Sequence, residues 1–456
     1  MSNENWLIYP TVDLFVYDLA DDSGKNEDKI SQNRAQFWQK IYGDKISAPQ
    51  LEKLKQAETE TEYIELLGDK QVVAFESPLE GYAYPVKIRD TYAVQFDLSG
   101  KIEPDDKKFA PEEIDRLGWQ KEKITSRVKP PATIGQSWLV WGQLTADDQD
   151  ALETAKNCYT QLNLFPNHKW GTDLKAEGKF LGADFYELWL PPGDRGKIEQ
   201  NYHVLICLFP YNSGQSIAEI SKTVAKLYLH LMQLFFSRNK VIWAYTKSRP
   251  LKADLEDAAR TIQDIVQQLP EQVNAPKVDL KKMQQTLVES LTIFSQYANY
   301  LSRIELQENT IKINLKNYKI RLETIGKNMG NDAEAFKFMA SFSDFAKEKY
   351  VGQVAADNRS LTVDLRLLEN AIQTIEGIIE IERAKSDRTL NVTIGTVGMG
   401  IGISGVVAST YSSQIKSPAS PINPMDVNAV FWSSIGLGIL PALIAIVLIA
   451  IGNRRR

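Results

Sequence analysis

Two uncharged apolar stretches close to the end of the sequence limit what this chain can fold into. They cover residues 390–410 and 427–451, and neither contains a charged side chain. A helix that crosses the hydrocarbon core of a bilayer needs about 20 apolar residues, at a rise of about 1.5 Å per residue. The sequence therefore predicts a transmembrane hairpin, with helix 1 over residues 390–410, an extracytoplasmic loop over 411–426 and helix 2 over 427–451.

Basic residues flank this hairpin on one side. Arg383, Lys385 and Arg388 precede the first stretch, the tail at 452–456 ends in three arginines, and the loop between the stretches contains only Lys416. The positive-inside rule then predicts that both termini are cytoplasmic. The chain also begins without a basic-then-apolar signal segment, so we expect its front portion to stay inside. The prediction is a multi-pass protein of an inner or cell membrane.

Composition narrows the classes of partner and cofactor. A formal net charge of −5 argues against a nucleic-acid-binding protein, which would carry a basic patch. Two cysteines and three histidines argue against a disulfide framework and a Cys/His metal site. No cofactor is identified. Acidic groups at residues 103–106 and 147–150 leave a divalent cation as a candidate, although a solvated loop and the first turn of a helix also explain them.

Residues 1–270 have the pattern of a cytoplasmic α/β domain. Residues 6–19 are rich in β-branched and aromatic side chains, residues 84–96 alternate between apolar and polar, and residues 204–209 are apolar on both faces, as in a central strand. Apolar residues at helical spacing over 217–234 predict an amphipathic helix, and a second helix over 251–269 is expected to stop at Pro270.

Residues 278–388 instead predict a coiled-coil-like stalk of long helices. An apolar seam at spacings of three and four continues to the start of the first apolar stretch, with no proline in between. The seam residues of the two longest segments are Ile311, Leu315, Tyr318, Leu322 and Ile325, followed by Leu361, Leu365, Leu368, Ile372, Ile375 and Ile379.

Two stripes inside the first apolar stretch predict how helix 1 is used. Continuing the stalk seam gives hydroxylated and small residues, as expected of a helix that lines a wet axis; these pore-lining candidates are Thr389, Thr393, Thr396 and Gly400. A second stripe of small residues predicts a helix-packing face; it consists of Asn391, Gly395, Gly398, Gly402, Gly405 and Ser409. Membrane threonines also bond their own helix carbonyls, and glycine is common in membrane helices, so both stripes have an alternative explanation.

The soluble part contains no nucleotide-binding, metalloprotease or serine-hydrolase motif. His203 and Cys207 are four residues apart on one predicted strand and face the same side. Buried core positions explain this pair better than a nucleophile and its base, so the sequence does not predict an enzyme.

This architecture resembles the CorA-type magnesium channel family. The similarity covers the topology of residues 278–456 and implies a homo-oligomer, a pentamer in that family, around the first membrane span. The family places a tyrosine-glycine-methionine-asparagine motif at the outer end of that span. Here Tyr411 matches the tyrosine, but Ser412, Ser413 and Gln414 replace the next three residues, and Asp426 is the loop's remaining acid. These five residues form the predicted outer mouth, and magnesium selectivity does not carry over.

The sequence thus leaves two functions open. The first is an ion-conducting oligomeric channel gated by its cytoplasmic domain. The alternative is a membrane-tethered signalling or antiviral defence effector whose cytoplasmic domain binds a partner or a nucleotide messenger. A passive structural role is the third and weakest interpretation.

Overall fold

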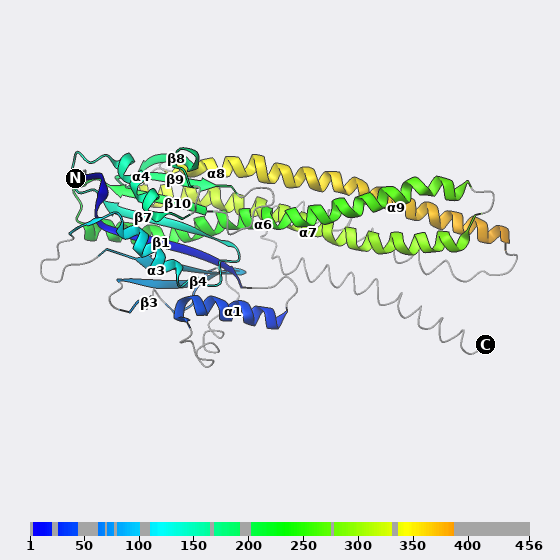
Figure 1. Cartoon of the computed structure of the whole chain (residues 1–456), viewed down its shortest axis with the longest axis horizontal. Helices are drawn as coiled ribbons and strands as arrows, with labels where there is room; N and C mark the ends of the chain where they lie inside the picture. Colours follow the sequence, from blue (N-terminus) through cyan, green and yellow to red (C-terminus); the bar gives the residue numbers. More distant parts are fainter. Residues whose placement is uncertain are drawn as a thin grey trace. The chain divides into compact units, whose positions relative to one another are not determined.

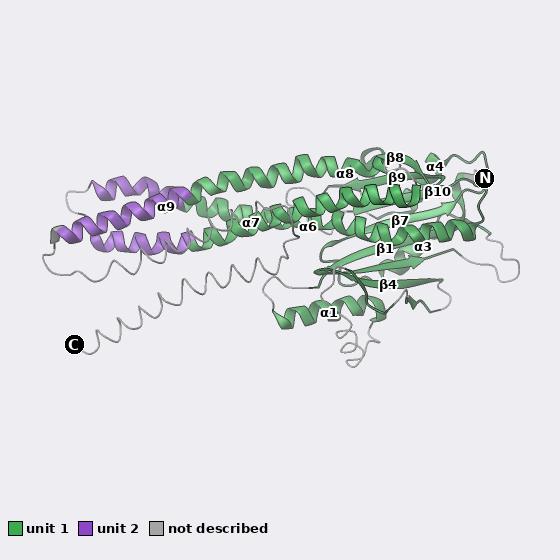
Figure 2. Ribbon diagram, turned by 180° about the vertical axis from the view of Figure 1, so that it is seen from behind, with its two compact units in different colours: residues 1–261, 295–365 green, residues 262–294, 366–456 purple. Residues whose placement is uncertain are grey.

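The computed structural model describes residues 3–20, 26–43, 63–68, 71–76, 80–100, 110–164, 168–191, 202–274, 278–330 and 336–386 (Figure 1). The chain divides into two compact units. Unit 1 comprises residues 1–261 and 295–365, and unit 2 comprises residues 262–294 and 366–456 (Figure 2).

The predicted membrane architecture requires correction. No helix in the part of the chain that the structure describes is both long enough and apolar enough to cross a membrane. The long helices are amphipathic rather than apolar, because charged residues recur along each of them. This finding contradicts the predicted fold with a transmembrane hairpin, the ion channel, the membrane-tethered effector, the membrane-embedded homo-oligomer and the multi-pass location with cytoplasmic termini. The segments 390–410, 411–426, 427–451 and 452–456 themselves lie outside the described residues.

The predicted α/β domain is confirmed. Its centre is a mixed sheet of ten strands among the described residues, in the order β2-β4-β5-β1-β7-β10-β9-β8, with β3 paired to β4 and β6 to β1. Strands β7 and β10 run parallel, and the other pairs are antiparallel. The strands are β1 (Trp6–Leu19), β2 (Ile64–Glu65), β3 (Val73–Ala74), β4 (Gly81–Ile88), β5 (Thr91–Leu98), β6 (Pro111–Glu113), β7 (Gly135–Gln143), β8 (Leu174–Phe180), β9 (Ala183–Leu190) and β10 (Tyr202–Phe209).

One face of the sheet packs on the helices that follow the early strands in sequence. These are α1 (Glu27–Tyr42), α3 (Arg116–Thr125), α4 (Ala151–Leu162) and the short α5 (Trp170–Asp173), and a short 3-10 turn, η1 (Asn3–Asn5), precedes β1. Even-numbered residues of β1, such as Leu14 and Val16, point into this layer and share one core with Trp38 of α1 and Leu117 of α3. Successive side chains of a strand alternate between its faces, so the odd-numbered residues point the other way.

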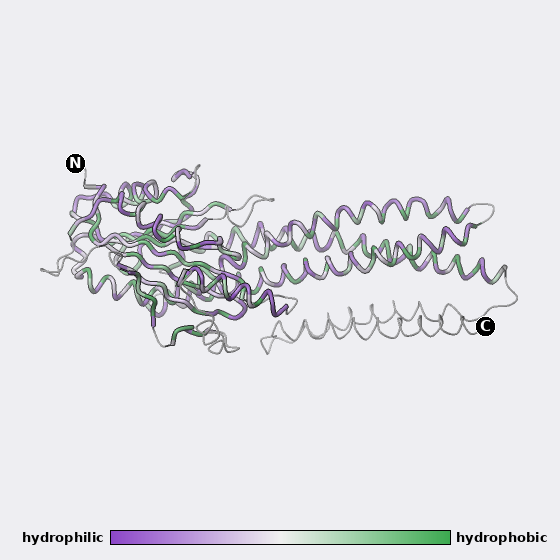
Figure 3. The backbone as a smooth tube through the Cα atoms, turned by 60° about the horizontal axis from the view of Figure 1, so that its bottom comes forward, coloured by the Kyte–Doolittle hydropathy of each residue, from purple (hydrophilic) through white to green (hydrophobic). Residues whose placement is uncertain are grey.

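The opposite face packs on long helices. Tyr17 donates a hydrogen bond to the carbonyl of Met232 in α6 (2.8 Å), and the ring of Phe15 lies 5.3 Å from that of Phe235 in the same helix. The helices of this part of the chain are α6 (Ile217–Val273), α7 (Leu280–Gly330), η4 (Lys337–Met339), α8 (Ala340–Phe345), the π-helical η5 (Ala346–Val351) and α9 (Gly352–Ser386), and the layer on the sheet is formed by their residues in unit 1. Hydrophobic and hydrophilic residues alternate along these helices (Figure 3).

Unit 2 contains the remaining parts of the three long helices and has a small core of its own. Leu269 of α6, Met283 of α7 and Ile375 of α9 are buried against one another together with Ala371 and Ile379. The predicted seam along the last helix is confirmed at five of its six positions, since Leu361, Leu368, Ile372, Ile375 and Ile379 are all buried.

Candidate functional site

Three ionisable side chains meet in unit 1, on the face of the sheet that packs on α6. Glu187 lies on β9, His203 on β10 and Arg238 on α6, and all three side chains are fully buried. On these two paired strands His203 is opposite Trp189 and Glu187 is opposite Leu205, so alternation directs Glu187, Trp189 and His203 to the same face. We call Glu187, His203 and Arg238 the ionic cluster.

Most side-chain nitrogens of this cluster lack a hydrogen-bond partner among the described residues. Nε2 of His203 lies 3.3 Å from Oε1 of Glu187, but without the geometry of a hydrogen bond. Both ring nitrogens of His203 and all three guanidinium nitrogens of Arg238 lack a hydrogen-bond partner among the described residues. The second carboxylate oxygen of Glu187 is 3.5 Å from the Ser341 hydroxyl. Buried donors and acceptors without partners cost about 1–3 kcal/mol each, and more when charged, so a core selected for stability alone would avoid this arrangement.

Aromatic rings surround Arg238 instead of acceptors. Its guanidinium carbon lies 4.7 Å from the centre of the Phe342 ring and 5.7 Å from that of Trp189. Trp189 also packs on Phe345, with ring centres 5.1 Å apart, and Phe345 packs on Tyr350 at 5.3 Å. Cation–π contacts stabilise the charge over the ring faces but leave the in-plane N–H donors of the guanidinium unused.

The covering layer is a short helical cap, residues 336–351, which includes η4, α8 and η5. The cap is seated on the sheet by phenylalanines: Phe336 lies 4.8 Å from Phe180 and 5.8 Å from Phe185, and Phe338 lies 5.7 Å from Phe185. Tyr318 of α7 donates a hydrogen bond to the carbonyl of Met339 (3.0 Å), which ties the cap to that helix. The ionic cluster is therefore enclosed by the sheet, α6, α7 and the cap.

Burial shifts the charge states of the cluster. It raises the pKa of Glu187 to about 8, although Arg238 and the contacts from Ser341 and Trp189 act in the opposite direction. Burial, together with the positive charge of Arg238, holds the pKa of His203 well below its usual value. Burial also lowers the pKa of Arg238, but an arginine stays protonated at neutral pH. At pH 7 the cluster thus carries a neutral histidine, a mostly protonated glutamate and a charged arginine.

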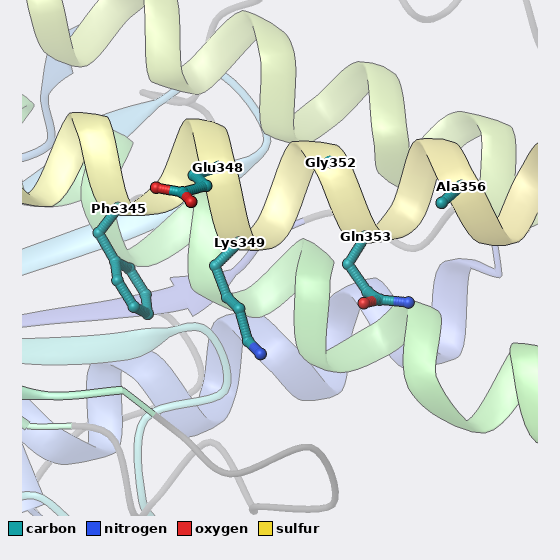
Figure 4. Close-up of a pocket in the computed structure, with 6 residues that line it drawn as sticks. All are labelled: Phe345, Glu348, Lys349, Gly352, Gln353 and Ala356. Atoms are coloured by element: carbon teal, nitrogen blue, oxygen red, sulfur yellow. The ribbon is translucent and has the colours of Figure 1, made fainter.

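A hollow of about 520 Å³ lies beside the cap and is lined by Phe345, Glu348, Lys349, Gly352, Gln353 and Ala356. Phe345, Lys349 and Gln353 project from the same side of the helix (Figure 4). Phe345 is shared, because it lines the hollow and also packs on Trp189 beside Arg238. The lining is continuous with η5, and π-helical segments occur frequently at functional sites.

A second group of buried carboxyls lies on the same face of the sheet. Asp13 of β1 and Asp97 of β5 are opposite each other, and Tyr228 of α6 donates to Asp97 (3.1 Å). Gln95 donates to Asp13 (2.7 Å) and Ser99 to Asp97 (2.9 Å). These hydrogen bonds satisfy the pair better than the ionic cluster is satisfied, which makes it the weaker candidate for a site.

The residues predicted as a site are not brought together by the described structure. All of them lie outside the described residues: the pore-lining candidates Thr389, Thr393, Thr396 and Gly400, the packing stripe Asn391, Gly395, Gly398, Gly402, Gly405 and Ser409, and the outer-mouth residues Tyr411, Ser412, Ser413, Gln414 and Asp426.

The described residues do bear on the smaller predictions. His203 and Cys207 are both buried on β10, and burial raises the pKa of the Cys207 thiol, which disfavours a nucleophile there. Asp150 caps α4 by accepting hydrogen bonds from the amides of Leu152 and Glu153. Residues 103–106 lie outside the described ranges, and within those ranges no group of three or more His, Cys, Asp or Glu side chains is placed to hold a metal ion. The divalent cation stays a prediction.

Sequence reasoning missed Glu187 and Arg238. For Glu187 the available signal was a charged residue inside an apolar strand, whereas Arg238 lies in a polar run, residues 237–240, between two apolar parts of a helix. Buried charged residues are rare unless they have a role or a partner.

Comparisons with family models, with curated proteins and with solved structures give no match for this chain. The resemblance to CorA-type channels therefore stays a prediction based on the sequence alone.

Proposed function

We propose that this protein is a non-enzymatic conformational switch, in which the ionic cluster couples the sheet to the helical cap and the long helices. The observation that carries the proposal is the complete burial of Glu187, His203 and Arg238 with unmatched hydrogen-bonding groups. Replacing buried ions by apolar residues is often neutral or stabilising, so their best-attested use is conformational specificity or switching.

The position of the cluster supports coupling. Its residues come from β9, β10 and α6, and the groups that face Arg238 electrostatically are Glu187, Tyr318 of α7 and Tyr350 of η5. A change of charge in the cluster therefore acts on the sheet, on two long helices and on the cap at once. A two-state element of this kind converts a local electrostatic event into a change of packing.

Acid–base catalysis is the alternative suggested by the raised pKa of Glu187 and the nearby His203. General acids and bases must come within hydrogen-bond reach of a substrate. Both side chains have no exposed surface, and Phe342 and Trp189 pack around the third member of the cluster. This burial favours a switch over an active site.

Hydrogen–deuterium exchange on the full chain tests the proposal. Arg238→Met should raise exchange in residues 336–351 and in the part of α7 near Tyr318. The matched control is Lys40→Met, which breaks another buried ion pair, Lys40 with Asp18 (2.6 Å), in the layer of α1. We expect that control to raise exchange in α1 and to leave the cap unchanged.

A milder variant covers the case in which Arg238→Met does not fold. In the wild type, cap exchange corrected for intrinsic rates should rise as the pH increases from about 4.5 to about 8 and change little above that, because the closed state holds a proton on Glu187 that an opened state releases. Glu187→Gln should remove this rise. A cap whose exchange is the same in every variant and at every pH would rule the switch out.

A further inference from the structure

The guanidinium of Arg238 has the features of an anion-binding group without a partner inside the protein. Its three nitrogens are buried and have no hydrogen-bond acceptor among the described residues, and its near neighbours are the rings of Phe342 and Trp189. No carboxylate among the described residues lies within salt-bridge distance of it, since the ion pairs that involve buried residues join other groups. A planar fork of N–H donors matches the oxygens of carboxylates and phosphates.

The charges around Arg238 leave it uncompensated at neutral pH. The facing groups are Glu187 on β9, His203 on β10, Tyr318 on α7 and Tyr350 on η5. Burial raises the pKa of both tyrosines as well as that of Glu187, and it lowers the pKa of His203. The guanidinium thus lies buried without an ionised acid within salt-bridge distance among the described residues, an arrangement that a bound anion would stabilise.

Additional donors point to the same kind of ligand. The Tyr350 hydroxyl is buried and has no hydrogen-bond partner among the described residues, and it belongs to the helical cap that covers Arg238. A protonated Glu187 and a neutral His203 can each donate one further hydrogen bond. Together these groups supply donors from the sheet, α6 and the cap.

The hollow beside the cap shares one side chain with the aromatic cover of Arg238. Its volume of about 520 Å³ is in the range of small-molecule sites, and Phe345, which lines it, packs on Trp189, whose ring lies 5.7 Å from the Arg238 guanidinium. Lys349 lines the hollow and attracts anions, while Glu348 on the same lining opposes them.

We propose that Arg238 is the anchor of a binding site for a small oxyanion, a carboxylate or phosphate group, which enters past Phe345 and is held between the sheet and the helical cap. This inference rests on the proposed function and names the ligand that operates the switch. A bound anion would compensate Arg238 and hold the cap closed.

Calorimetric titration of the full chain at pH 7 and constant ionic strength tests the site, with inorganic phosphate and with acetate as probes and chloride as the balancing salt. We expect saturable binding of at least one probe. Binding of phosphate alone assigns a phosphoryl ligand, binding of acetate alone assigns a carboxylate, and binding of both assigns a general oxyanion site.

Matched variants locate the binding. Arg238→Met should weaken it at least about tenfold, as expected for loss of hydrogen bonds to a charged group. Arg260→Gln, an exposed position on the same helix, should leave it unchanged. If Arg238→Met does not fold, Arg238→Lys retains the charge but loses the fork of donors and should still weaken binding several-fold. No saturable binding of either probe, or equal binding in the Arg238 variants and the wild type, would overturn the proposal.

The two proposals can fail separately. If neither anion binds but Arg238→Met still loosens residues 336–351, the switch stands and the oxyanion site is wrong. If phosphate or acetate binds through Arg238 while exchange in the cap does not change, the site stands and the switch is wrong.

Discussion

Asp13 of β1 and Asp97 of β5 are direct cross-strand partners, and both carboxyl groups are buried against α6. Like charges opposite each other destabilise a sheet, so the pair is stable only when it shares a proton. Burial and the neighbouring carboxylate raise the pKa of Asp13 well above its usual value, and burial raises that of Asp97 to about 6. The folded protein therefore takes up protons at this site.

Asp13→Asn should stabilise the protein increasingly as the pH rises above about 4. A group whose pKa is raised by folding contributes stability below its unfolded pKa and loses it as the pH rises through the folded pKa. Asparagine keeps the donor and acceptor of the protonated acid without the cost of proton uptake. The advantage over the wild type should grow by up to about 1.4 kcal/mol per pH unit. Urea unfolding from pH 4 to pH 8 measures it, with the exposed Asp254→Asn as control.

Glu187→Gln should remove part of the alkaline loss of stability. Because the pKa of Glu187 is raised to about 8, the wild type loses stability between about pH 4.5 and pH 8 and changes little above that range. Relative to the wild type, the glutamine variant should gain in unfolding free energy over the same range.

His203→Gln is the control for that experiment, because its effect on stability should depend on pH in the opposite direction. Burial lowers the pKa of His203, so the folded state binds fewer protons than the unfolded chain and the wild type loses stability as the pH falls below about 6.5. The glutamine variant should therefore gain on the acid side. Thermal unfolding from pH 5 to pH 9 records both profiles, and two variants with parallel curves would contradict the assigned charge states.

The sequence predicts elements well where one physical signal dominates. Residues 6–19 form β1 with the expected bounds, because β-branched and aromatic side chains fill both faces of a strand between two layers. The strand at 204–209 is interior, between β7 and β9. The seam at 217–234 is buried, since α6 covers the sheet.

Turns and helix ends were harder to predict. The alternating stretch 84–96 is in fact two strands, β4 and β5, joined by a tight hairpin in which Arg89 adopts a positive φ of 54°. Arginine is not a residue that signals such a turn, and the alternation continues through it. Likewise, the sequence predicts a helix that stops at Pro270, but α6 continues through Pro250 and Pro270 to Val273. Packing of a long amphipathic helix outweighs these local signals.

The candidate site could not be predicted, because it is assembled from distant parts of the chain. Glu187, His203 and Arg238 are ordinary residues in sequence, and only the pairing of β9 with β10 under α6 brings them together. The two stripes within residues 390–410 are local patterns, so they can be recognised in the sequence. A buried cluster depends on tertiary packing, which a periodicity does not specify.

Asp357→Ala should destabilise the contact between α6 and α9 in unit 1. Asp357 is nearly buried, accepts from Arg249 (2.7 Å), lies 3.3 Å from Lys252 and also accepts from Gln353 (2.9 Å). Removing it leaves Arg249 without its carboxylate partner, while Lys252 keeps Glu256 at 3.3 Å, and we expect a loss of about 3 kcal/mol in unfolding free energy. Glu153→Ala removes the partly exposed ion pair with Lys156 and should cost at most about 1 kcal/mol. A double-mutant cycle with Arg249→Met should give a coupling energy above about 1 kcal/mol; equal effects of the two single variants would contradict the buried clamp.

Gly178→Ala should lift the helical cap from the sheet. Gly178 of β8 pairs with Phe185 of β9, and a Cβ atom at this position would lie inside the van der Waals distance of the Phe338 ring. Because Phe338 also packs on Phe185, the added methyl group must displace the cap, and overpacking of this kind costs about 1–3 kcal/mol. Gly171→Ala is the matched control, since no atom lies within 4 Å of the place where its methyl group would sit.

Denaturant unfolding gives the stability of the Gly178→Ala variant, and hydrogen exchange over residues 336–351 shows whether the cap is the part that loosens. Phe338→Leu in the Gly178→Ala background should recover part of the loss, because the smaller side chain makes room for the methyl group. If Gly178→Ala instead behaves like Gly171→Ala in both measurements, Phe338 does not seat the cap on β8, and the cap would be coupled to the sheet through Phe336 and the ionic cluster.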